Sequence, residues 1–460
     1  MDRFLDFADL IDRMAASMPE RAALRVCDGV GELRDVSWRE LRERVVARSG
    51  ELAAAGSACE AILADGSAEC VVEVFAAVRA GLQVALVDPL VPNDMLAPLL
   101  ASVDADCVWS AQASRQAELE SRLMPVAPPA YGAHAVLFFT SGTTSRSKAV
   151  VLTDESLMSS AFNGSSLMPL SPDDTLLCLL PLSHVFGFVC GLLWGLACGA
   201  TVALGRGMRY YAADMAAFDP TAVAVVPRLL EFLVACGALG ESLRLVLVGA
   251  ADCRDELLAA VRARGIRVSL GYGLTETSSG IALSVGGDFH AMTVCPEDEV
   301  TISEDGEILV HAPTCLMKGY YRDEARTADA IRDGILHTGD KGYLDAAGLL
   351  HVQGRLKDVI ALPNGTKVYV PEYEAAVREA LGEQDIAVVL QGGALTLACG
   401  RLAHAHSDEA VSEAVARALR AYPPASRIGR IVRLGHPLPR TAAGDVERWK
   451  IQEELENGNC

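Results

Sequence analysis

The chain carries the stretch AVLFFTSGTTSRSKAVVLT at residues 135–153, where one apolar run enters a short polar turn and a second apolar run leaves it. The turn combines several hydroxyl groups and a glycine with two cations, Arg146 and Lys148. Hydroxyls, exposed backbone N–H groups and cations on one turn suit an anionic phosphate group. The pattern is not a Walker A loop, because no second glycine precedes Lys148 and the following run predicts a strand rather than a helix. The stretch predicts a phosphate-binding hairpin, and a Ser/Thr-rich turn without a ligand is the plain alternative.

The chain around this hairpin alternates between strand-like and helical patterns. Apolar runs typical of strands occur at Val71–Val78, Ala135–Phe139, Ala222–Val226 and Leu243–Val248, and a helical stretch follows at Arg254–Arg264. Such alternation favours βαβ units and mainly parallel sheets. A chain of 460 residues that is 51% hydrophobic is too long for one ordinary core, so we expect two or more structural units.

The pattern changes after about residue 355. The last hundred or so residues predict, in order, a helix, two strands and a second helix, at Pro371–Leu381, Asp385–Leu390, Leu395–Cys399 and Asp408–Ala421. The segment at 354–358 is the candidate linker. The sequence therefore predicts a large multi-sheet α/β domain at residues 1–356 and a small α+β domain at residues 357–460.

Composition excludes several classes of protein. The net charge of -20 disfavours binding to nucleic acids or to anionic membrane surfaces. The 13 cysteines are odd in number and form no C-x-x-C pair, which argues against a disulfide framework or a zinc site. Free thiols in a reducing compartment are the simplest interpretation, so we expect a cytoplasmic protein.

Two stretches of the sequence indicate whether the chain carries a signal peptide or a membrane-spanning segment. The N-terminal segment lacks the basic start and apolar block of a signal peptide, and it is instead acidic and amphipathic. Its apolar residues recur at helical spacing, at Phe4, Phe7, Leu10, Ile11 and Met14. Residues 176–204 contain no charge and are long enough to span a bilayer. Pro181, His184 and several glycines favour a strand, a turn and a buried helix there instead.

With Lys148 closing an unbroken TSGTTxxxK, the turn resembles the signature of the adenylate-forming, or AMP-binding, superfamily. That superfamily includes acyl-CoA synthetases, adenylation domains of peptide synthetases and luciferases. The resemblance covers roughly residues 5–455 and rests on further stretches in the family's order, namely LGYGLTET at 270–277, YYR at 320–322, HTGD at 337–340, GRLKDVI at 354–360 and NGTKVY at 364–369. It implies that ATP phosphates bind to the turn, at Thr140, Ser141, Gly142, Thr143, Thr144 and Lys148.

The resemblance also implies how the nucleoside and the metal ion are held. Tyr272, next to Gly273, is expected to pack on adenine, and a second adenine-contacting loop is expected at Gly249 and Ala250. The ribose hydroxyls are expected to bind Asp340 and Arg355. Thr275 is expected beside the α-phosphate, and Glu276 is expected to hold Mg²⁺, which suits an ion that prefers carboxylate and phosphate oxygens.

The second half-reaction depends on the small domain. In the family, the counterpart of Asp358 is a hinge about which a mobile C-terminal domain rotates. The rotation is expected to bring Lys367 and the loop at Gly365 toward the site, where a thiol attacks. Lys148, Thr275, Glu276 and Lys367 are therefore the candidate catalytic residues.

The acyl pocket is expected beside two segments, with His184, Phe186 and Gly187 on one wall and Pro227 on the other. No carboxylate lies between residues 176 and 204 to bind an α-ammonium group, so an amino acid substrate is disfavoured. An apolar, glycine-rich wall suits a fatty or aromatic acid. The remaining length leaves no room for a carrier-protein domain, which favours coenzyme A as acceptor. A separate carrier protein is the alternative.

One position departs from the family pattern PRTxxGKxxR. The chain reads LPRTAAGDVER at 438–448, so Asp445 stands where the family has lysine. That lysine bridges the substrate carboxylate and the α-phosphate, and losing such a donor costs about 10²–10³ in rate. Three explanations stay open. Lys450 or Lys367 substitutes for it, the enzyme is slow at adenylation yet competent at thioester formation, or the residue is an engineered change or a mark of lost catalysis with binding kept.

The sequence as a whole predicts ATP-dependent activation of a small-molecule carboxylic acid to an acyl-AMP, followed by transfer to coenzyme A. The motifs look most like those of bacterial acyl-CoA synthetases. A catalytically impaired adenylate-binding homologue is the rival from another functional class.

Overall fold

The computed structural model describes the residues 3–28, 31–123, 129–140, 148–251, 253–356, 359–362, 367–382, 385–401, 407–420, 427–440 and 446–456. These residues fall into two compact units. The larger comprises the described parts of 1–140, 147–338 and 343–352, and the smaller comprises 339–342 and the described residues from 353 onward. The division after residue 356 remains a proposal.

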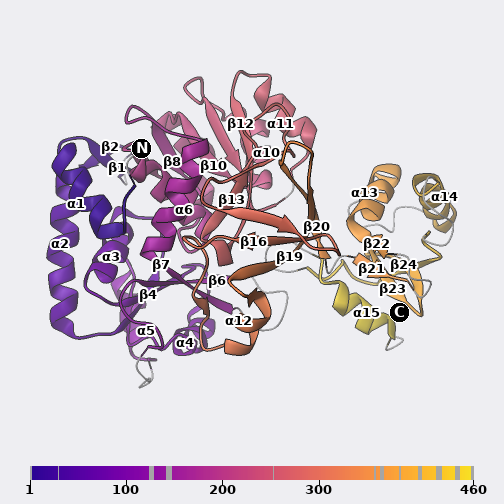
Figure 1. Ribbon diagram of the computed structural model, residues 1–460, viewed down its shortest axis with the longest axis horizontal. Helices are drawn as coiled ribbons and strands as arrows, with labels where there is room; N and C mark the ends of the chain where they lie inside the picture. Colours follow the sequence, from indigo (N-terminus) through magenta and orange to yellow (C-terminus); the bar gives the residue numbers. More distant parts are fainter. Residues whose placement is uncertain are drawn as a thin grey trace. The chain divides into compact units, whose positions relative to one another are not determined.

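Two sheets form most of the larger unit (Figure 1). The first has the strand order β14 (Thr293–Val294), β13 (Ser279–Leu283), β12 (Arg267–Leu274), β11 (Leu245–Val248), β10 (Ala222–Val225), β8 (Thr175–Cys178), β9 (Thr201–Leu204), β1 (Ala22–Cys27) and β2 (Leu33–Ser37). The six central strands of this sheet are parallel to one another, namely β12, β11, β10, β8, β9 and β1.

The second sheet has the order β17 (Gly319–Tyr320), β7 (Lys148–Thr153), β6 (Ala135–Thr140), β4 (Gln83–Val87), β3 (Cys59–Leu63) and β5 (Cys107–Trp109). Strands β6, β4, β3 and β5 are parallel, whereas β7 returns antiparallel to β6 and β17 is antiparallel to β7. A third sheet has the order β15 (Glu299–Ile302), β16 (Glu307–His311), β19 (Ile335–Leu344) and β18 (Ile331–Arg332), with β20 (Leu350–Arg355) paired to β19. The predicted multi-sheet α/β class is confirmed.

Helices connect these strands and cover them. In the larger unit they are α1 (Phe7–Ser17), α2 (Trp38–Ala55), α3 (Ala68–Arg79), α4 (Asn93–Ser102), α5 (Ala113–Glu120), α6 (Asp154–Leu167), α7 (Val185–Phe188), the π-helical turn η1 (Val189–Leu193), α8 (Trp194–Ala197), the 3₁₀ turn η2 (Met208–Tyr210), α9 (Tyr211–Phe218), α10 (Pro227–Ala235), α11 (Asp255–Arg262), the 3₁₀ turn η3 (Thr275–Thr277) and α12 (Glu324–Ala330). Helices α1, α2 and α3 lie side by side in the indigo and violet part of Figure 1.

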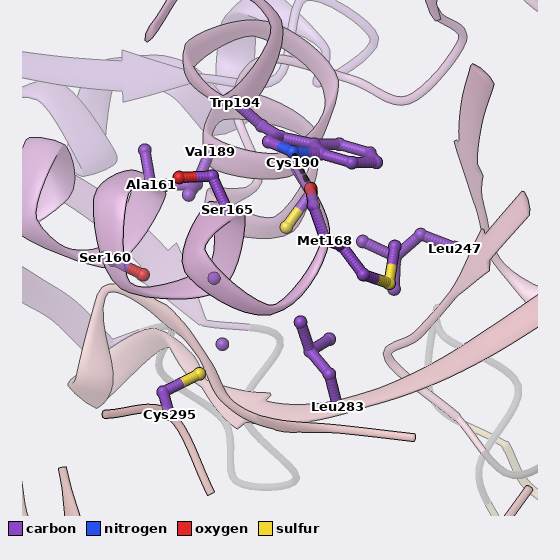
Figure 2. Close-up of a pocket in the computed structure, with 12 residues that line it drawn as sticks. Ser160, Ala161, Ser165, Met168, Val189, Cys190, Trp194, Leu247, Leu283 and Cys295 are labelled. Carbon is purple, nitrogen blue, oxygen red and sulfur yellow. Dashed lines mark hydrogen bonds between the residues drawn. The ribbon is translucent and has the colours of Figure 1, made fainter. Parts of the chain in front are cut away.

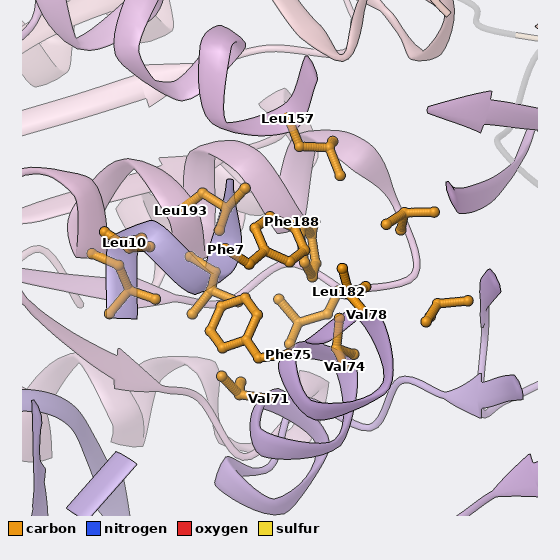
Figure 3. Packing of buried hydrophobic residues seen from close by; sticks show 14 of the residues in the cluster. Phe7, Leu10, Val71, Val74, Phe75, Val78, Leu157, Leu182, Phe188 and Leu193 are labelled. Carbon is orange, nitrogen blue, oxygen red and sulfur yellow. The ribbon is translucent and has the colours of Figure 1, made fainter. Parts of the chain in front are cut away.

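The main hydrophobic core joins the N-terminal helix to the centre of the larger unit. Figure 3 shows the rings of Phe7, Phe75 and Phe188 gathered among aliphatic side chains from α3 and η1. The Phe7 ring centroid lies 5.0 Å from that of Phe75 in an edge-on arrangement and 5.9 Å from that of Phe188. Aromatic pairs at such separations add to the free energy that burial alone provides. The amphipathic N-terminal helix predicted from the sequence is therefore a core element.

One predicted strand is wrong. The run Val71–Val78 lies inside helix α3, where each of its residues is buried. A segment buried on all sides has no polar face, so its hydrophobic periodicity cannot separate a helix from a strand. The local signal for a helix is Ser67, whose hydroxyl accepts a hydrogen bond from the backbone N–H of Cys70 and caps the first turn.

The uncharged stretch at 176–204 forms short elements. It contains the buried ends of β8 and β9, with α7, η1 and α8 between them. Among the described residues, no helix is long and apolar enough to cross a membrane. The predicted strand, turn and buried helix are confirmed.

The smaller unit has the predicted α+β order. It contains α13 (Val370–Leu381), α14 (Asp408–Ala418) and α15 (Arg448–Glu456), with β21 (Val359–Ala361) paired to β22 (Lys367–Tyr369) and β24 (Ala394–Cys399) lying between β23 (Ile386–Gln391) and β25 (Arg430–Arg433). Buried Glu374 joins α13 to α15, because its carboxylate accepts from Arg378 at 2.8 Å and from Arg448 at 3.0 Å. The first residues of the predicted linker at 354–358 are part of a strand, because Gly354 and Arg355 still belong to β20.

A buried carboxyl group makes the stability of the larger unit depend on pH. Burial, and then the charge of Glu73, raises the pKa of Glu60 from 4.5 to about 9. Glu73 itself accepts two hydrogen bonds from Arg48, at 2.8 and 2.7 Å. Because the folded-state pKa of Glu60 lies above its unfolded value, the stabilisation is complete below pH 4.5 and is lost as the pH rises through about 9.

We therefore expect the free energy of unfolding to fall by about 1–2 kcal/mol between pH 7 and pH 9. Urea denaturation across this range measures the change. Asp298, whose pKa burial raises to about 7, contributes in the same direction. The difference between wild type and Glu60→Gln isolates Glu60, and identical pH slopes in the two proteins would contradict the prediction.

Candidate active site

The hairpin at 135–153 is present and defines one edge of the site. Strands β6 and β7 are antiparallel, with Thr140 paired to Lys148 where the turn begins and ends. Val150 of β7 pairs with Tyr320 of β17, so a third segment lies beside the base of the hairpin. The turn itself, with Ser141, Gly142, Thr143 and Thr144, lies outside the described residues, as does the side chain of Thr140. Phosphate binding by these residues remains a prediction.

Lys148, Tyr320 and Glu276 meet beside this hairpin. The Lys148 ammonium lies 4.8 Å from the centroid of the Tyr320 ring, and the Tyr320 hydroxyl donates a hydrogen bond of 2.7 Å to Glu276 Oε1. Burial, and then the Glu276 carboxylate, raises the pKa of Tyr320 well above its usual value, so the hydroxyl keeps its proton. A cation and a carboxylate thus lie on two sides of one buried phenol.

This cluster fits a divalent cation that arrives with phosphate. Glu276 is partly exposed and supplies carboxylate oxygen, and the hydroxyl-bearing Thr275 precedes it. Among the described residues, no group of three or more His, Cys, Asp or Glu side chains could hold a metal ion by themselves. Mg²⁺ is commonly bound by one or two carboxylates together with substrate phosphates, which is the arrangement that Glu276 allows.

Glu276 is positioned by a tight antiparallel hairpin of β12 and β13, which has a register irregularity between Tyr272 and Gly273. Gly273 pairs with Gly280, and a Cβ atom added to Gly273 would lie 1.6 Å from the carbonyl oxygen of Ser279. The η3 turn that carries Glu276 follows at once, and Thr277 braces it through hydrogen bonds of 3.1 Å with the backbone N–H and C=O of Leu274. Ser279 has a φ of 105°, which is unusual for a residue other than glycine. The segment is a strand followed by a single 3₁₀ turn.

The segment predicted to contact adenine touches the segment predicted to line the acyl pocket. Gly249 follows β11, and a Cβ atom added there would lie 2.8 Å from the Phe186 ring. The next residue, Ala250, has a positive φ of 67°, which turns the chain sharply after the strand. Tyr272 is partly buried and packs against the core of the sheet. These residues place the two predicted subsites next to each other within the larger unit.

The other predicted acyl-wall residues lie at the starts of two helices, α7 and α10, and within the first of them. His184 is exposed at the start of α7, and Pro227 is the first residue of α10. Gly187 is buried, and a Cβ atom added there would lie 2.2 Å from the carbonyl oxygen of Pro181.

A pocket lies in the larger unit, and Figure 2 shows residues of its walls. It is lined by Ser160, Ala161, Gly164, Ser165, Met168, Val189, Cys190, Trp194, Leu247, Gly280, Leu283 and Cys295. None of the four predicted acyl-wall residues is among them. Phe186 nevertheless packs against the apolar cluster that includes the pocket residues Met168, Trp194 and Leu247.

In the smaller unit, the two predicted ribose ligands are paired with each other. Arg355 Nε lies 2.9 Å from Asp340 Oδ1, and the Asp340 side chain is buried while half of the Arg355 side chain is exposed. Lys367 pairs with Ala361 through its backbone in β22, but its side chain is outside the described part of the chain. Asp358, Gly365 and Asp445 lie outside it as well.

One of the two cations considered as a substitute for the missing lysine is engaged elsewhere. Lys450 Nζ lies 2.6 Å from Glu447 Oε2 and 5.4 Å from the centroid of the Trp449 ring. Arg448, the framing arginine of the motif, is held by Glu374. Lys450 would have to leave Glu447 to act on a substrate.

Sequence reasoning missed two residues that the structure brings forward. Tyr320 lies in the YYR stretch that carries the resemblance, yet no role follows from the letters, because its contact with Glu276 joins segments 44 residues apart. Ser160 lies in the middle of α6 and is one of the residues around the pocket, and only its spacing of four residues from Gly164, which is another, marks one face of that helix.

The chain matches known proteins over most of its length. The model of the family described as AMP-binding enzyme matches residues 11–321. An indoleacetate–CoA ligase of Aromatoleum aromaticum is 29% identical, over 98% of this chain and 94% of the relative. A 2-succinylbenzoate–CoA ligase of Bacillus licheniformis is 30% identical, over 76% of this chain and 75% of the relative.

Solved structures share the fold. The O-succinylbenzoate coenzyme A synthetase MenE from Bacillus subtilis, in complex with ATP and magnesium ion, aligns with a TM-score of 0.78 at 24% identity. The alignment covers 96% of this chain and 98% of that chain. The likeness therefore extends through the large N-terminal and the small C-terminal part.

Proposed function

This chain belongs to the AMP-binding enzyme family, and from that premise we propose that it is an AMP-forming acid–thiol ligase that activates a carboxylic acid with ATP and transfers the acyl group to coenzyme A. The relatives that it matches are named as CoA ligases. The observation that carries the proposal is the cluster of Lys148, Tyr320 and Glu276 at the base of the hydroxyl-rich hairpin.

The proposed reaction has two halves. The carboxylate attacks the α-phosphate of ATP, which gives acyl-AMP and pyrophosphate, and a thiol then displaces AMP to give the thioester. Lys148 and the turn at 141–147 bind the phosphates and offset their negative charge. Glu276 is held in place by Tyr320 and binds Mg²⁺, which neutralises phosphate charge when it is bound. Thr275 lies beside the α-phosphate.

The remaining assignments concern the nucleoside and the second half-reaction. We propose that Tyr272, Gly273, Gly249 and Ala250 bind adenine and that Asp340 and Arg355 bind the ribose. The Asp340–Arg355 ion pair supports this, because it holds a buried carboxylate in one orientation for a diol. Rotation about Asp358, which brings Lys367 toward the thiol, is proposed from the family resemblance, as are the cytoplasmic location and a fatty or aromatic acid substrate.

The test is acid-dependent exchange of pyrophosphate into ATP, followed by formation of acyl-CoA, over a panel of short, medium, long-chain and aromatic acids. We expect exchange with at least one class of acid and a thioester with coenzyme A. Acyl transfer to a holo-carrier protein but not to coenzyme A would reassign the acceptor. ATP binding without exchange or thioester formation on any acid would refute ligase activity.

Asp445 favours a second candidate function. A protein that binds a nucleotide or an acyl-adenylate without turning it over does not need the family's catalytic lysine. Such a protein would tolerate an aspartate at that position. Unaltered nucleotide affinity together with no turnover would identify that function.

Removal of the Tyr320 hydroxyl is expected to loosen the metal site. In Tyr320→Phe, Glu276 loses a charge-assisted hydrogen bond, and the Mg²⁺ concentration for half-maximal exchange should rise about tenfold. Tyr321→Phe is the matched control, because its hydroxyl instead donates to Asp104 at 2.7 Å. An equal Mg²⁺ requirement in the two variants would show that Tyr320 does not position Glu276.

A further inference from the structure

Ser278 follows the η3 turn directly and is fully buried. Its hydroxyl donates to the carbonyl oxygen of Cys315 at 2.7 Å and lies 3.0 Å from the hydroxyl oxygen of Ser156. These two partners are 37 and 122 residues away in the sequence. One buried side chain therefore joins the turn that carries Glu276 to two other segments of the larger unit.

The segment at Ser156 begins where the phosphate hairpin ends. Ser156 lies in the first turn of α6, which follows directly on β7, the strand that starts at Lys148. The Ser156 hydroxyl donates to the carbonyl of Thr153 at 2.9 Å and accepts from the backbone N–H of Thr153 at 3.0 Å. Since Thr153 is the last residue of β7, the contact of Ser278 with Ser156 fixes η3 to the end of that strand.

The segment at Cys315 leads to Tyr320. The backbone N–H of Met317 donates to the carbonyl of Glu276, and that of Lys318 donates to the carbonyl of Val151 in β7, both at 2.8 Å. Residues 315–318 therefore run between η3 and β7. Ser278 holds the start of this run, and Tyr320, just beyond its end, holds the Glu276 carboxylate.

The backbone at Ser278 would suit glycine better than serine. Ser278 has φ 53° and ψ 29°, in the left-handed region, and the next residue, Ser279, also has a positive φ. Residues other than glycine adopt this conformation at a free-energy cost, and it persists where surrounding contacts over-determine it. A glycine would follow the same path without strain but could not make either hydroxyl contact. The chain thus accepts strain at a position where only the hydroxyl distinguishes serine from alanine.

We propose that Ser278 is a positioning residue, whose hydroxyl fixes η3 against β7 and the 315–318 segment and so sets the place of the Glu276 carboxylate relative to Lys148. Groups that orient a metal ligand through hydrogen bonds typically change metal affinity or activity by about 10–100-fold. The inference rests on the proposed function, because it takes Glu276 as the carboxylate that meets Mg²⁺ and Lys148 as a cation that binds phosphate. Ser278 is buried and acts through Glu276.

Three variants separate this role from a contribution to stability alone. Ser278→Gly removes the hydroxyl and relieves the backbone, whereas Ser278→Ala removes the hydroxyl and keeps the strain. Ser269→Ala is the matched control. Ser269 is fully buried near the other end of β12, and its hydroxyl donates to the carbonyl of Ser284 at 2.7 Å. This control deletes one buried hydrogen bond that does not reach η3.

The measurement is titration calorimetry of each purified protein with ATP, once with excess Mg²⁺ and once with EDTA. The ratio of the two dissociation constants gives the gain in ATP affinity that Mg²⁺ provides. We expect both Ser278 variants to reduce this gain about tenfold with an unchanged affinity in EDTA, and Ser269→Ala to keep the wild-type gain. In thermal denaturation, Ser278→Gly should melt above Ser278→Ala, and Ser269→Ala should melt below wild type. A purely structural role would instead make the gain follow the melting temperature.

A wild-type gain in Ser278→Gly, or an equal loss in Ser269→Ala and Ser278→Ala, would overturn the proposal. An ATP affinity of wild type that Mg²⁺ does not change would overturn it as well. Pyrophosphate exchange distinguishes it from the proposed ligase. A gain that depends on Ser278, in a protein that turns over no acid, would support the positioning role and count against the ligase. Turnover with the same Mg²⁺ requirement in wild type and Ser278→Gly would overturn the positioning role while the ligase stands.

Discussion

Asp445→Lys is expected to raise the rate of acid-dependent pyrophosphate exchange about 10²–10³-fold, which is the usual worth of one donor aimed at charge that develops in a transition state. The framing residues of the motif are all present around Asp445, so a lysine there restores the family pattern. A carboxylate at this position would act in the opposite sense if the motif approaches the phosphates as in the family, because at about 4 Å it would repel a phosphate oxygen by roughly 1–4 kcal/mol. The gain should appear in the adenylation step.

Two controls separate the contributions. Asp445→Asn removes the negative charge without adding a donor and should give a smaller gain, about tenfold, from lost repulsion alone. Thioester formation from a chemically prepared acyl-AMP should change little in either variant if the enzyme is competent at that half-reaction. Exchange that is equally fast with Asp, Asn and Lys at this position would show that another cation already acts. Lys367→Ala and Lys450→Ala would then identify it.

Gly273→Ala should destabilise the protein by about 3 kcal/mol or more and reduce exchange at least 100-fold, because overpacking against backbone is costly and the hairpin of β12 and β13 positions Glu276. The added methyl group would lie 1.6 Å from the carbonyl oxygen of Ser279, 2.5 Å from its carbonyl carbon and 2.9 Å from the Cα atom of Gly280. All three are backbone atoms, so no rotamer change relieves the clash. The strands must separate, and the η3 turn moves with them.

Gly280→Ala is the matched control for stability, since Gly280 faces Gly273 in the pairing and a Cβ atom added to it meets nothing within 4 Å. Urea denaturation of the two variants measures the difference. A Gly273→Ala protein as stable and active as Gly280→Ala would mean that the backbones of β12 and β13 do not approach each other this closely at Gly273.

The alternating apolar runs were enough to predict the α/β class and several of the strands, such as those at 135–139, 222–226 and 243–248, because each depends on local periodicity and on the residues that end it. The run at 71–78 failed for the same local reason, since a fully buried segment has no alternation to interpret. The acyl wall shows a different limit. The resemblance predicts Phe186 and Gly187 near the substrate, and this stays a prediction, whereas the lining of the pocket in Figure 2 combines segments of α6, η1, β11 and β13 that only folding brings together.

The sequence by itself determined the hydroxyl-rich hairpin, the order of the family motifs and the departure at Asp445, since each is a run of adjacent residues, and phosphate binding by the turn stays a prediction from it. The tertiary structure alone decided that Tyr320 joins Lys148 to Glu276 and that Gly249 lies against the ring of Phe186. Such contacts depend on strand register and helix packing between segments far apart in the chain. A local pattern carries no information about them.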